Sequence, residues 1–254
     1  MWINLPRPKP TPMATGRRPM PCRLWLCLLL ACPPAWADWH GKLSVLSEYV
    51  YRGYSKSWGN PVVQGQLGYQ DASGWFAGAA VSQASFDGRD YPEHTDLEAK
   101  PFLGVYWPLG TDWRAELSAY GYIYDGEVFS KPADFVEFSA AMHYQDWLSG
   151  KISVAPDAYQ RQATVDYELN YRHNLTDTVQ FSAGLGLYQA DRLLGKNYLY
   201  WNLGASWFLD AHLVFDCRYV DVQLDGDYAA GSRPDAFHPK LLGSQLLLTL
   251  SAGF

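Results

Sequence analysis

Apolar and polar residues alternate with a period of two along most of the chain, which is the pattern of a strand with one apolar face. In the segment 164–172 the apolar face is Val165, Tyr167, Leu169 and Tyr171, and the opposite face is Asp166, Glu168, Asn170 and Arg172. The same analysis predicts twelve strands, near residues 42–53, 61–70, 75–84, 95–107, 112–124, 134–145, 147–155, 162–173, 177–189, 197–208, 211–222 and 243–254. We therefore expect an all-β fold.

Strands with one charged and one apolar face suit two architectures. In a transmembrane barrel the charged face lines a wet interior and the apolar face contacts lipid. In a soluble sandwich the polar face contacts water and the apolar face packs in a core. Alternation alone does not separate these two possibilities.

The connections between the predicted strands favour the barrel. Short connections alternate with longer ones, and the five short ones fall at 71–74, 108–111, 145–146, 174–177 and 210. A twelve-stranded outer-membrane barrel with both termini in the periplasm needs five short turns there and six outer loops. Tryptophans lie beside the short turns, as in an aromatic girdle at one membrane interface: Trp75, Trp107, Trp113, Trp147 and Trp207. We therefore expect a transmembrane antiparallel β-barrel of about twelve strands.

The C-terminal segment is an alternating strand that ends in an aromatic residue. Its apolar positions are Leu246, Leu248, Leu250, Ala252 and Phe254. This segment resembles the closing strand of Gram-negative outer-membrane barrels. The resemblance implies that Leu246, Leu248, Leu250 and Phe254 form a signal that the barrel assembly machinery reads.

The N-terminal residues 1–37 have the order of a secretory signal peptide. The apolar run 24–31 follows Arg17, Arg18 and Arg23, and Ala35-Trp36-Ala37 provides an A-x-A cleavage site. An alternative interpretation acylates Cys32 as a lipoprotein cysteine, and Met13 or Met20 is an alternative start within an over-extended N-terminus. The predicted domains are thus a signal peptide at 1–37 and an outer-membrane barrel at 38–254, in the outer membrane of a Gram-negative cell.

Composition narrows the function classes further. The 20 Lys and Arg residues include five within residues 1–37, whereas all 26 acidic residues lie after them. The mature chain is therefore acidic, which argues against nucleic acid as a partner. Cys217 alone remains after cleavage, so no disulfide or thiolate metal cluster is expected. No cofactor or metal motif is found, and no segment is long enough for a transmembrane helix.

Three segments resemble the TorF-like porin family of proteobacterial outer-membrane proteins. They are Ser47-Glu-Tyr-Val-Tyr-Arg-Gly-Tyr-Ser55, Asn60-Pro-Val-Val-Gln-Gly65 and Gly74-Trp-Phe-Ala-Gly78. The late segment Asp216-Cys-Arg-Tyr-Val-Asp221 and the terminal Phe254 are similar to that family as well. The resemblance implies a barrel and a porin, and it supplies no catalytic or binding residue.

The charged residues on the inward faces are the candidate lining of a lumen. They are Glu48, Arg52, Asp96, Glu98, Lys100, Arg114, Glu116, Glu137, Lys151, Asp166, Glu168, Arg172, Asp216 and Arg218. They either line a polar channel or pair into a salt-bridged plug, because buried charges in a narrow barrel must pair. Pairing within one strand is possible for Glu48/Arg52, Glu98/Lys100, Arg114/Glu116 and Asp216/Arg218.

These observations predict a small passive channel for small hydrophilic solutes, in contact with outer-membrane lipids and lipopolysaccharide. Acids outnumber bases in this lining and in the predicted outer loops, so a weak cation preference is expected. One alternative is a closed barrel that acts structurally or binds partners through its outer loops. Another is a lipid-modifying enzyme, but no histidine has a serine two residues away and no G-x-S-x-G motif is present, so no catalytic residue is predicted.

Overall fold

The computed structural model of the chain describes residues 38–86, 94–223 and 237–254. The predicted signal peptide at 1–37 lies outside these residues. The segments 87–93 and 224–236 also lie outside the described residues. They contain several of the acidic loop residues on which the expected cation preference depends. Among the described residues, no helix combines the length and the hydrophobicity needed to cross a membrane.

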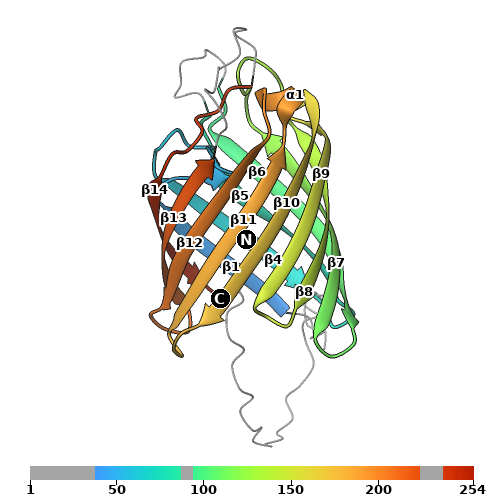
Figure 1. Cartoon of the computed structure of the whole chain (residues 1–254), viewed down its shortest axis with the longest axis vertical. Coiled ribbons are helices and arrows are strands. Elements are labelled where there is room, and N and C mark those ends of the chain that lie inside the picture. The colour runs from blue at the N-terminus through green and yellow to red at the C-terminus, as the bar shows by residue number, and fades with distance from the viewer. Residues whose placement is uncertain (1–37, 87–93, 224–236) are drawn as a thin grey trace, which may run out of the picture.

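Twelve antiparallel strands form a closed barrel (Figure 1). Each strand pairs with its neighbours in the sequence, and β1 closes the barrel by pairing with β14. The wall strands are β1 (Asp38–Leu46), β4 (Val62–Gln70), β5 (Trp75–Gln83), β6 (Leu97–Leu109), β7 (Trp113–Tyr124), β8 (Phe135–Tyr144), β9 (Leu148–Ala158), β10 (Gln162–Asn174), β11 (Val179–Gln189), β12 (Tyr198–Phe208), β13 (Leu213–Gln223) and β14 (Gln245–Gly253). The predicted strand number and the all-β class are confirmed.

The two ends of the barrel differ in their connections (Figure 1). The turn end holds the tight turns after β4, β6, β8, β10 and β12, and the first and last strands also begin or end there. The loop end holds the other six connections, including the short helix α1 (Asp191–Leu194). One of these six, residues 159–161, is as short as a turn because β9 extends to Ala158 rather than to 155.

The first predicted strand, 42–53, is wrong at its end. β1 stops at Leu46, which pairs directly with Val62 of β4. The residues between them, 47–61, leave the wall and form a separate hairpin of β2 (Val50–Tyr51) and β3 (Tyr54–Ser55). We call residues 47–61 the inserted hairpin, because the side chains of residues 48–57 are buried or half-buried inside the barrel.

The outer face of the barrel is apolar and the inner face is polar, as the alternation predicts. Leu246, Leu248 and Leu250 of β14 are exposed on the outside, whereas Ser251 is buried inside. The tryptophans of the predicted girdle are all exposed and lie at the turn end, together with Trp39 of β1. Such an apolar belt with an aromatic rim at one edge is typical of a transmembrane barrel.

Candidate functional site: the barrel lumen

The inserted hairpin turns sharply back on itself inside the barrel. Arg52 and Gly53 form its tip, with φ angles of 49° and 83°. Positive φ is unfavourable for an arginine, so contacts of the Arg52 side chain must hold this conformation. Lys56, which directly follows β3, has no exposed surface.

The Arg52 guanidinium joins two strands on the wall. Its Nη1 lies 2.7 Å from a carboxylate oxygen of Glu137 on β8, and its Nε lies 2.9 Å from one of Asp166 on β10. The hydroxyl of Tyr51 also donates to Glu137, over 3.1 Å. Because all three charged side chains are almost fully buried, these contacts fix the tip of the hairpin between β8 and β10.

Lys56 forms the second attachment of the hairpin. Its Nζ lies 2.5 Å from Glu98 on β6, and the hydroxyls of Tyr49 and Tyr124 each donate to the same carboxylate over 2.7 Å. Burial lowers the pKa of Lys56 from 10.5 to about 8, although the Glu98 carboxylate acts in the opposite direction. Three donors therefore occupy Glu98 at the mouth of the barrel.

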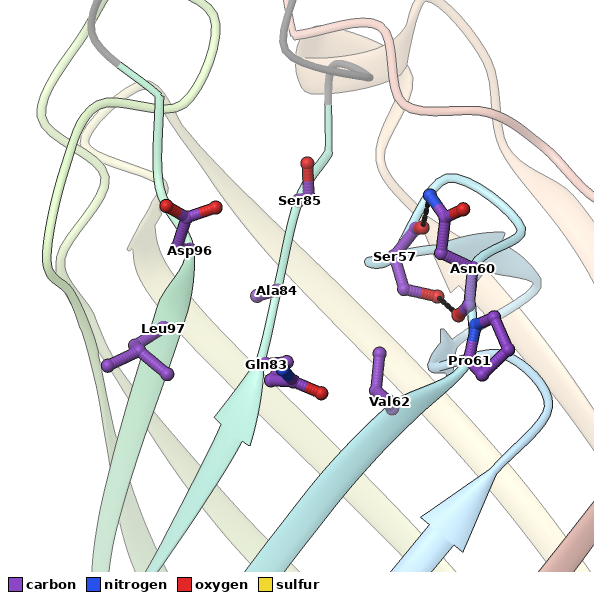
Figure 2. Close-up of a pocket in the computed structure, with 9 residues that line it drawn as sticks. All are labelled: Ser57, Asn60, Pro61, Val62, Gln83, Ala84, Ser85, Asp96 and Leu97. Atoms are coloured by element: carbon purple, nitrogen blue, oxygen red, sulfur yellow. Dashed lines mark hydrogen bonds between the residues drawn. The ribbon is translucent and has the colours of Figure 1, made fainter.

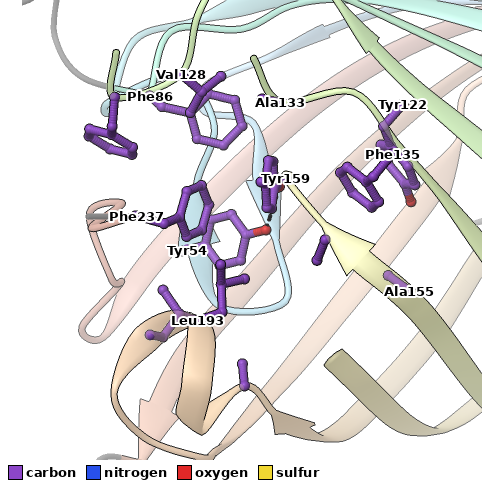
Figure 3. Close-up of a cluster of buried hydrophobic side chains, with 14 of the residues drawn as sticks. Tyr54, Phe86, Tyr122, Val128, Ala133, Phe135, Ala155, Tyr159, Leu193 and Phe237 are labelled. Carbon is purple, nitrogen blue, oxygen red and sulfur yellow. Dashed lines mark hydrogen bonds between the residues drawn. The ribbon is translucent and has the colours of Figure 1, made fainter. Parts of the chain in front are cut away.

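Aromatic side chains fill the space around the hairpin at the loop end. The hydroxyls of Tyr54 and Tyr159 are 2.6 Å apart, and the Tyr159 ring stacks on Phe237 with centroids separated by 4.2 Å (Figure 3). Tyr122 and Phe135 stack at 4.4 Å in the same cluster. All five of these side chains are buried, so a packed core occupies the half of the lumen nearer the loop end, which we call the loop half.

The remaining part of the lumen, the turn half, has a lining of small polar residues. Ser44 of β1 and Ser251 of β14 form a hydrogen bond of 2.8 Å across the closing seam. Ser139 and Ser153 do the same between β8 and β9. Short side chains of this kind cover the wall without reaching the barrel axis, so they leave room for solvent.

Larger inward side chains lie flat against the wall over glycines of neighbouring strands. A Cβ atom on Gly204 would come within 2.9 Å of the Arg218 guanidinium carbon, and one on Gly104 within 2.3 Å of the Phe76 ring. Arg218 crosses Gly204 to reach Ser182, over 3.0 Å, as well as Asn202. These glycines therefore allow bulky groups to lie along the wall instead of across the lumen.

Most of the residues expected to line the lumen are on the inner face, but three differ in position. Glu48 and Arg52 belong to the inserted hairpin rather than to the wall. Asp96 precedes β6 at the rim, and its side chain is 57% exposed beside His94. Inward faces of wall strands carry the others: Glu98, Lys100, Arg114, Glu116, Glu137, Lys151, Asp166, Glu168, Arg172, Asp216 and Arg218.

Pairing within strands is rare in the lumen. Of the four pairs that the spacing within a strand permits, Asp216 with Arg218 is present, at 3.1 Å. The other ion pairs of the lumen connect different strands or a strand and the hairpin, as Lys151 does with Glu168 at 2.7 Å. Arg114 instead places its guanidinium over the Tyr106 ring, 4.9 Å from its centroid.

Two cations of the lumen were not among the predicted lining residues. Lys42 lies on the inner face of β1, and Lys56 enters with the hairpin although an outer-loop position is predicted for it. The alternation of β1 places Lys42 opposite the outward Leu43, so the sequence held a signal for the first of them. Among the described residues the lining has one more base than acid: Lys42, Arg52, Lys56, Lys100, Arg114, Lys151, Arg172 and Arg218 against Glu48, Glu98, Glu116, Glu137, Asp166, Glu168 and Asp216.

A serine, a histidine and a carboxylate meet in the turn half, but their order does not suit nucleophilic catalysis. The Ser118 hydroxyl donates to Glu116 over 2.8 Å, and His143 Nε2 lies 3.1 Å from the other oxygen of that carboxylate. A catalytic serine needs the imidazole as its own hydrogen-bond partner. Here the carboxylate separates the two groups, so this cluster lacks the geometry of a triad.

A pocket of about 500 Å³ lies at the rim of the loop end (Figure 2). Ser57 and Asn60 of the inserted hairpin form one side, and Gln83 and Asp96 belong to the opposite side. Ser57 and Asn60 bind each other through the hydrogen bonds Ser57 Oγ to Asn60 O and Asn60 Nδ2 to Ser57 O, of 2.7 and 3.0 Å. The pocket therefore marks the junction between the base of the hairpin and the wall.

A closed barrel with an apolar outside, an aromatic rim and a charged inside defines the class of transmembrane β-barrel proteins. Within this class, the chain belongs to the family described as bacterial protein of unknown function (Gcw_chp), whose model matches residues 34–254. A search of curated proteins finds no match.

Three solved structures with the same fold are named as porins or channels. The KdgM porin matches with a TM-score of 0.51 at 10% identity, over 85% of this chain and 98% of its own. The COG4313 outer membrane channel from Pseudomonas putida F1 matches with 0.51 at 11% identity, over 88% and 97%. The NanC porin matches with 0.51 at 9% identity, over 85% and 99%. At these identities the likeness shows the fold.

Proposed function

We propose that the protein is a passive outer-membrane channel for small hydrophilic solutes. The observation that carries the proposal is the lining of the turn half, where serines cover the wall and larger side chains lie over glycines. A barrel whose only role is structural has no need to keep bulky groups away from its axis. The names of the structures with this fold and the resemblance to the TorF-like porin family support the same function.

The loop half supports a second candidate, a closed barrel with a structural or binding role. The inserted hairpin and the aromatic cluster fill this half, and its buried ion pairs resist displacement. Conduction therefore requires a path beside the hairpin or its movement. The two candidates differ in one measurable property, which is the ion current through a folded barrel.

Planar-bilayer recording on the purified mature barrel tests the proposal. A channel should give discrete conductance steps, with heat-modifiable migration on a gel confirming that the sample is folded. A folded barrel that carries no current, even after the hairpin is removed, would contradict the proposal and favour the closed barrel.

The proposal places the barrel in the outer membrane, surrounded by lipids and lipopolysaccharide and inserted by the barrel assembly machinery. Deleting Phe254 or changing Leu250 to Asp should reduce the folded band in membranes, because Leu250 faces outward and a charge in the bilayer costs roughly 2 kcal/mol. Thr249 faces inward, so Thr249→Asp is the matched control and should insert normally. Equal loss with both substitutions would contradict the lipid-facing assignment.

The proposed orientation directs the turn end to the periplasm and the loop end to the cell exterior. In a chain lacking Cys217, a cysteine at the exposed Arg192 of α1 should react with an impermeant maleimide on intact cells. A cysteine at Ser73, in the turn after β4, should react only after the outer membrane is opened. The reverse pattern would invert the orientation.

A further inference from the structure

Two lysines face the lumen at the same level of the wall. Register pairing places Lys42 of β1 beside Gln66 of β4, Gln66 beside Ala80 of β5, and Ala80 beside Lys100 of β6. Three strand spacings of roughly 4.8 Å thus separate the two backbones, a gap that long lysine side chains can narrow. The two ammonium groups repel each other across the small Ala80 and the amide of Gln66.

Neither lysine forms an ion pair within the described residues. Two carboxylates that attract Lys100 also bind the inserted hairpin: Glu98 binds Lys56 and Tyr49 as well as Tyr124 of β7, and Glu137 binds Arg52 and Tyr51. Lys100 instead lies near two tyrosine rings, with its Nζ 5.9 Å from the centroid of Tyr120 and 5.8 Å from that of Tyr122. Both carboxylates still attract Lys100, but their ion pairs are with the hairpin, so Lys100 shares their charge with Arg52 and Lys56.

Two like charges on a partly buried wall are unfavourable unless a counter-charge is near. Arg52, Lys56 and Lys151 each pair with a carboxylate. Within the described residues Lys42 and Lys100 have no such pair, and neither has Arg114, which lies over the Tyr106 ring instead. Water and small ions reach the lumen of a channel, so an anion can provide a counter-charge for Lys42 and add to the one that Lys100 shares.

We propose that Lys42 and Lys100, with Gln66 between them, form an anion-binding site in the lumen that selects solutes carrying a carboxylate. The two ammonium groups bind the carboxylate oxygens, and the Gln66 amide can donate a further hydrogen bond. The site deepens the proposed channel function and rests on it. It favours anions inside the lumen, whereas the acidic loop residues that favour cations belong to the mouth.

Block of the ion current by succinate tests the site, with neutral succinamide as the comparison ligand. Succinate should reduce the current through the wild-type barrel and succinamide should not. In the variant Lys42→Gln/Lys100→Gln the half-blocking concentration should rise by about tenfold or more, because two charge-assisted contacts are lost. The charge-conserving variant Lys42→Arg/Lys100→Arg should keep the block, which separates binding from a change in folding.

The matched control is Arg192→Gln/Lys240→Gln, which removes the same charge from exposed positions and should leave the half-blocking concentration unchanged. An unchanged block in Lys42→Gln/Lys100→Gln would overturn the site, as would equal block by succinate and succinamide in the wild type. Titration calorimetry of succinate into the folded, detergent-solubilised barrel gives a readout that needs no current. A folded barrel that carries no current but binds succinate through these lysines would contradict the channel function and support the site. A barrel that conducts but does not bind succinate would support the channel function and contradict the site.

Discussion

The two halves of the lumen are lined by the same strands but differ in how far inward side chains fill them. In the loop half, carboxylates of three wall strands hold a buried hairpin, and aromatic rings pack around it. In the turn half, serines hydrogen-bond to one another and an arginine lies flat over a glycine. The same twelve strands therefore enclose a lumen that side chains fill at the loop end and only line at the turn end.

The difference shows that strand number does not decide whether a barrel is open. Twelve strands lie between small barrels that side chains fill and large barrels that enclose a channel. At this size, the side chains and one connection determine the free cross-section. The connection after β1 is the decisive one, because it enters the lumen although its two ends are paired neighbours in the wall.

Removing the hairpin should have the largest effect on this comparison. Since Leu46 and Val62 are directly paired, a short Gly-Ser turn can replace residues 47–61 without stretching the wall. Single-channel conductance should increase several-fold, because the loop half would lose the hairpin and keep only the side chains of the wall and of the other connections. Bilayer recording measures the effect, and an unchanged conductance in a folded barrel would show that the hairpin does not lie on the conduction path.

Arg52→Ala should loosen the hairpin without removing it. The change leaves Glu137 and Asp166 buried without their partner, and breaking a buried ion pair in this way costs about 3–5 kcal/mol. We expect larger and noisier currents together with faster trypsin cleavage after Lys56.

The matched control is Arg218→Ala in the turn half, whose partner Asp216 is less buried. This variant should keep Lys56 protected from trypsin. Equal protection of Lys56 in both variants would mean that Arg52 does not anchor the hairpin.

The glycine-lined wall of the turn half can be tested by adding a side chain. In Gly204→Leu the new group must displace Arg218 from the wall and break its contacts with Ser182 and Asn202. Conductance of the barrel without the hairpin should fall moderately, because the guanidinium would then point toward the axis. Gly150→Leu is the control, since nothing lies within 4 Å of its Cβ position, and it should leave the current unchanged.

The sequence predicts the strands of the barrel wall better than the side chains and the hairpin inside the lumen. Alternation predicts which residues face outward, and the prediction agrees with the structure for β10 and β14. The facing of a strand is strongly specified, because a slip of one residue would turn all of its apolar side chains inward. Alternation also continues through Tyr49 and Tyr51, so it gives no sign that the wall strand ends at Leu46. The tip at Arg52-Gly53 was the available signal, since glycine readily adopts positive φ.

The ion pairs could not be predicted because they connect strands far apart in the sequence. Lys56 to Glu98 and Arg52 to Asp166 depend on where the hairpin lies, and no spacing within a strand encodes that position. The predicted pair Asp216/Arg218 is present because both residues lie on one face of one strand.

The smallest expected effect is a pH dependence of the hairpin that comes from Lys56. In the inserted state its pKa is about 8, compared with 10.5 for an exposed lysine, so the inserted state binds fewer protons between these two values. By linkage, raising the pH through this window favours the inserted state, and below pH 8 the balance is constant. Conductance should therefore decrease modestly from pH 8 to pH 10, which is opposite to the increase expected if deprotonation simply broke the bond to Glu98. Lys56→Met removes the titrating group and should abolish the trend. An increase of current with pH that disappears in Lys56→Met would show that the ion pair, rather than the burial of the amine, controls how firmly the loop half is filled.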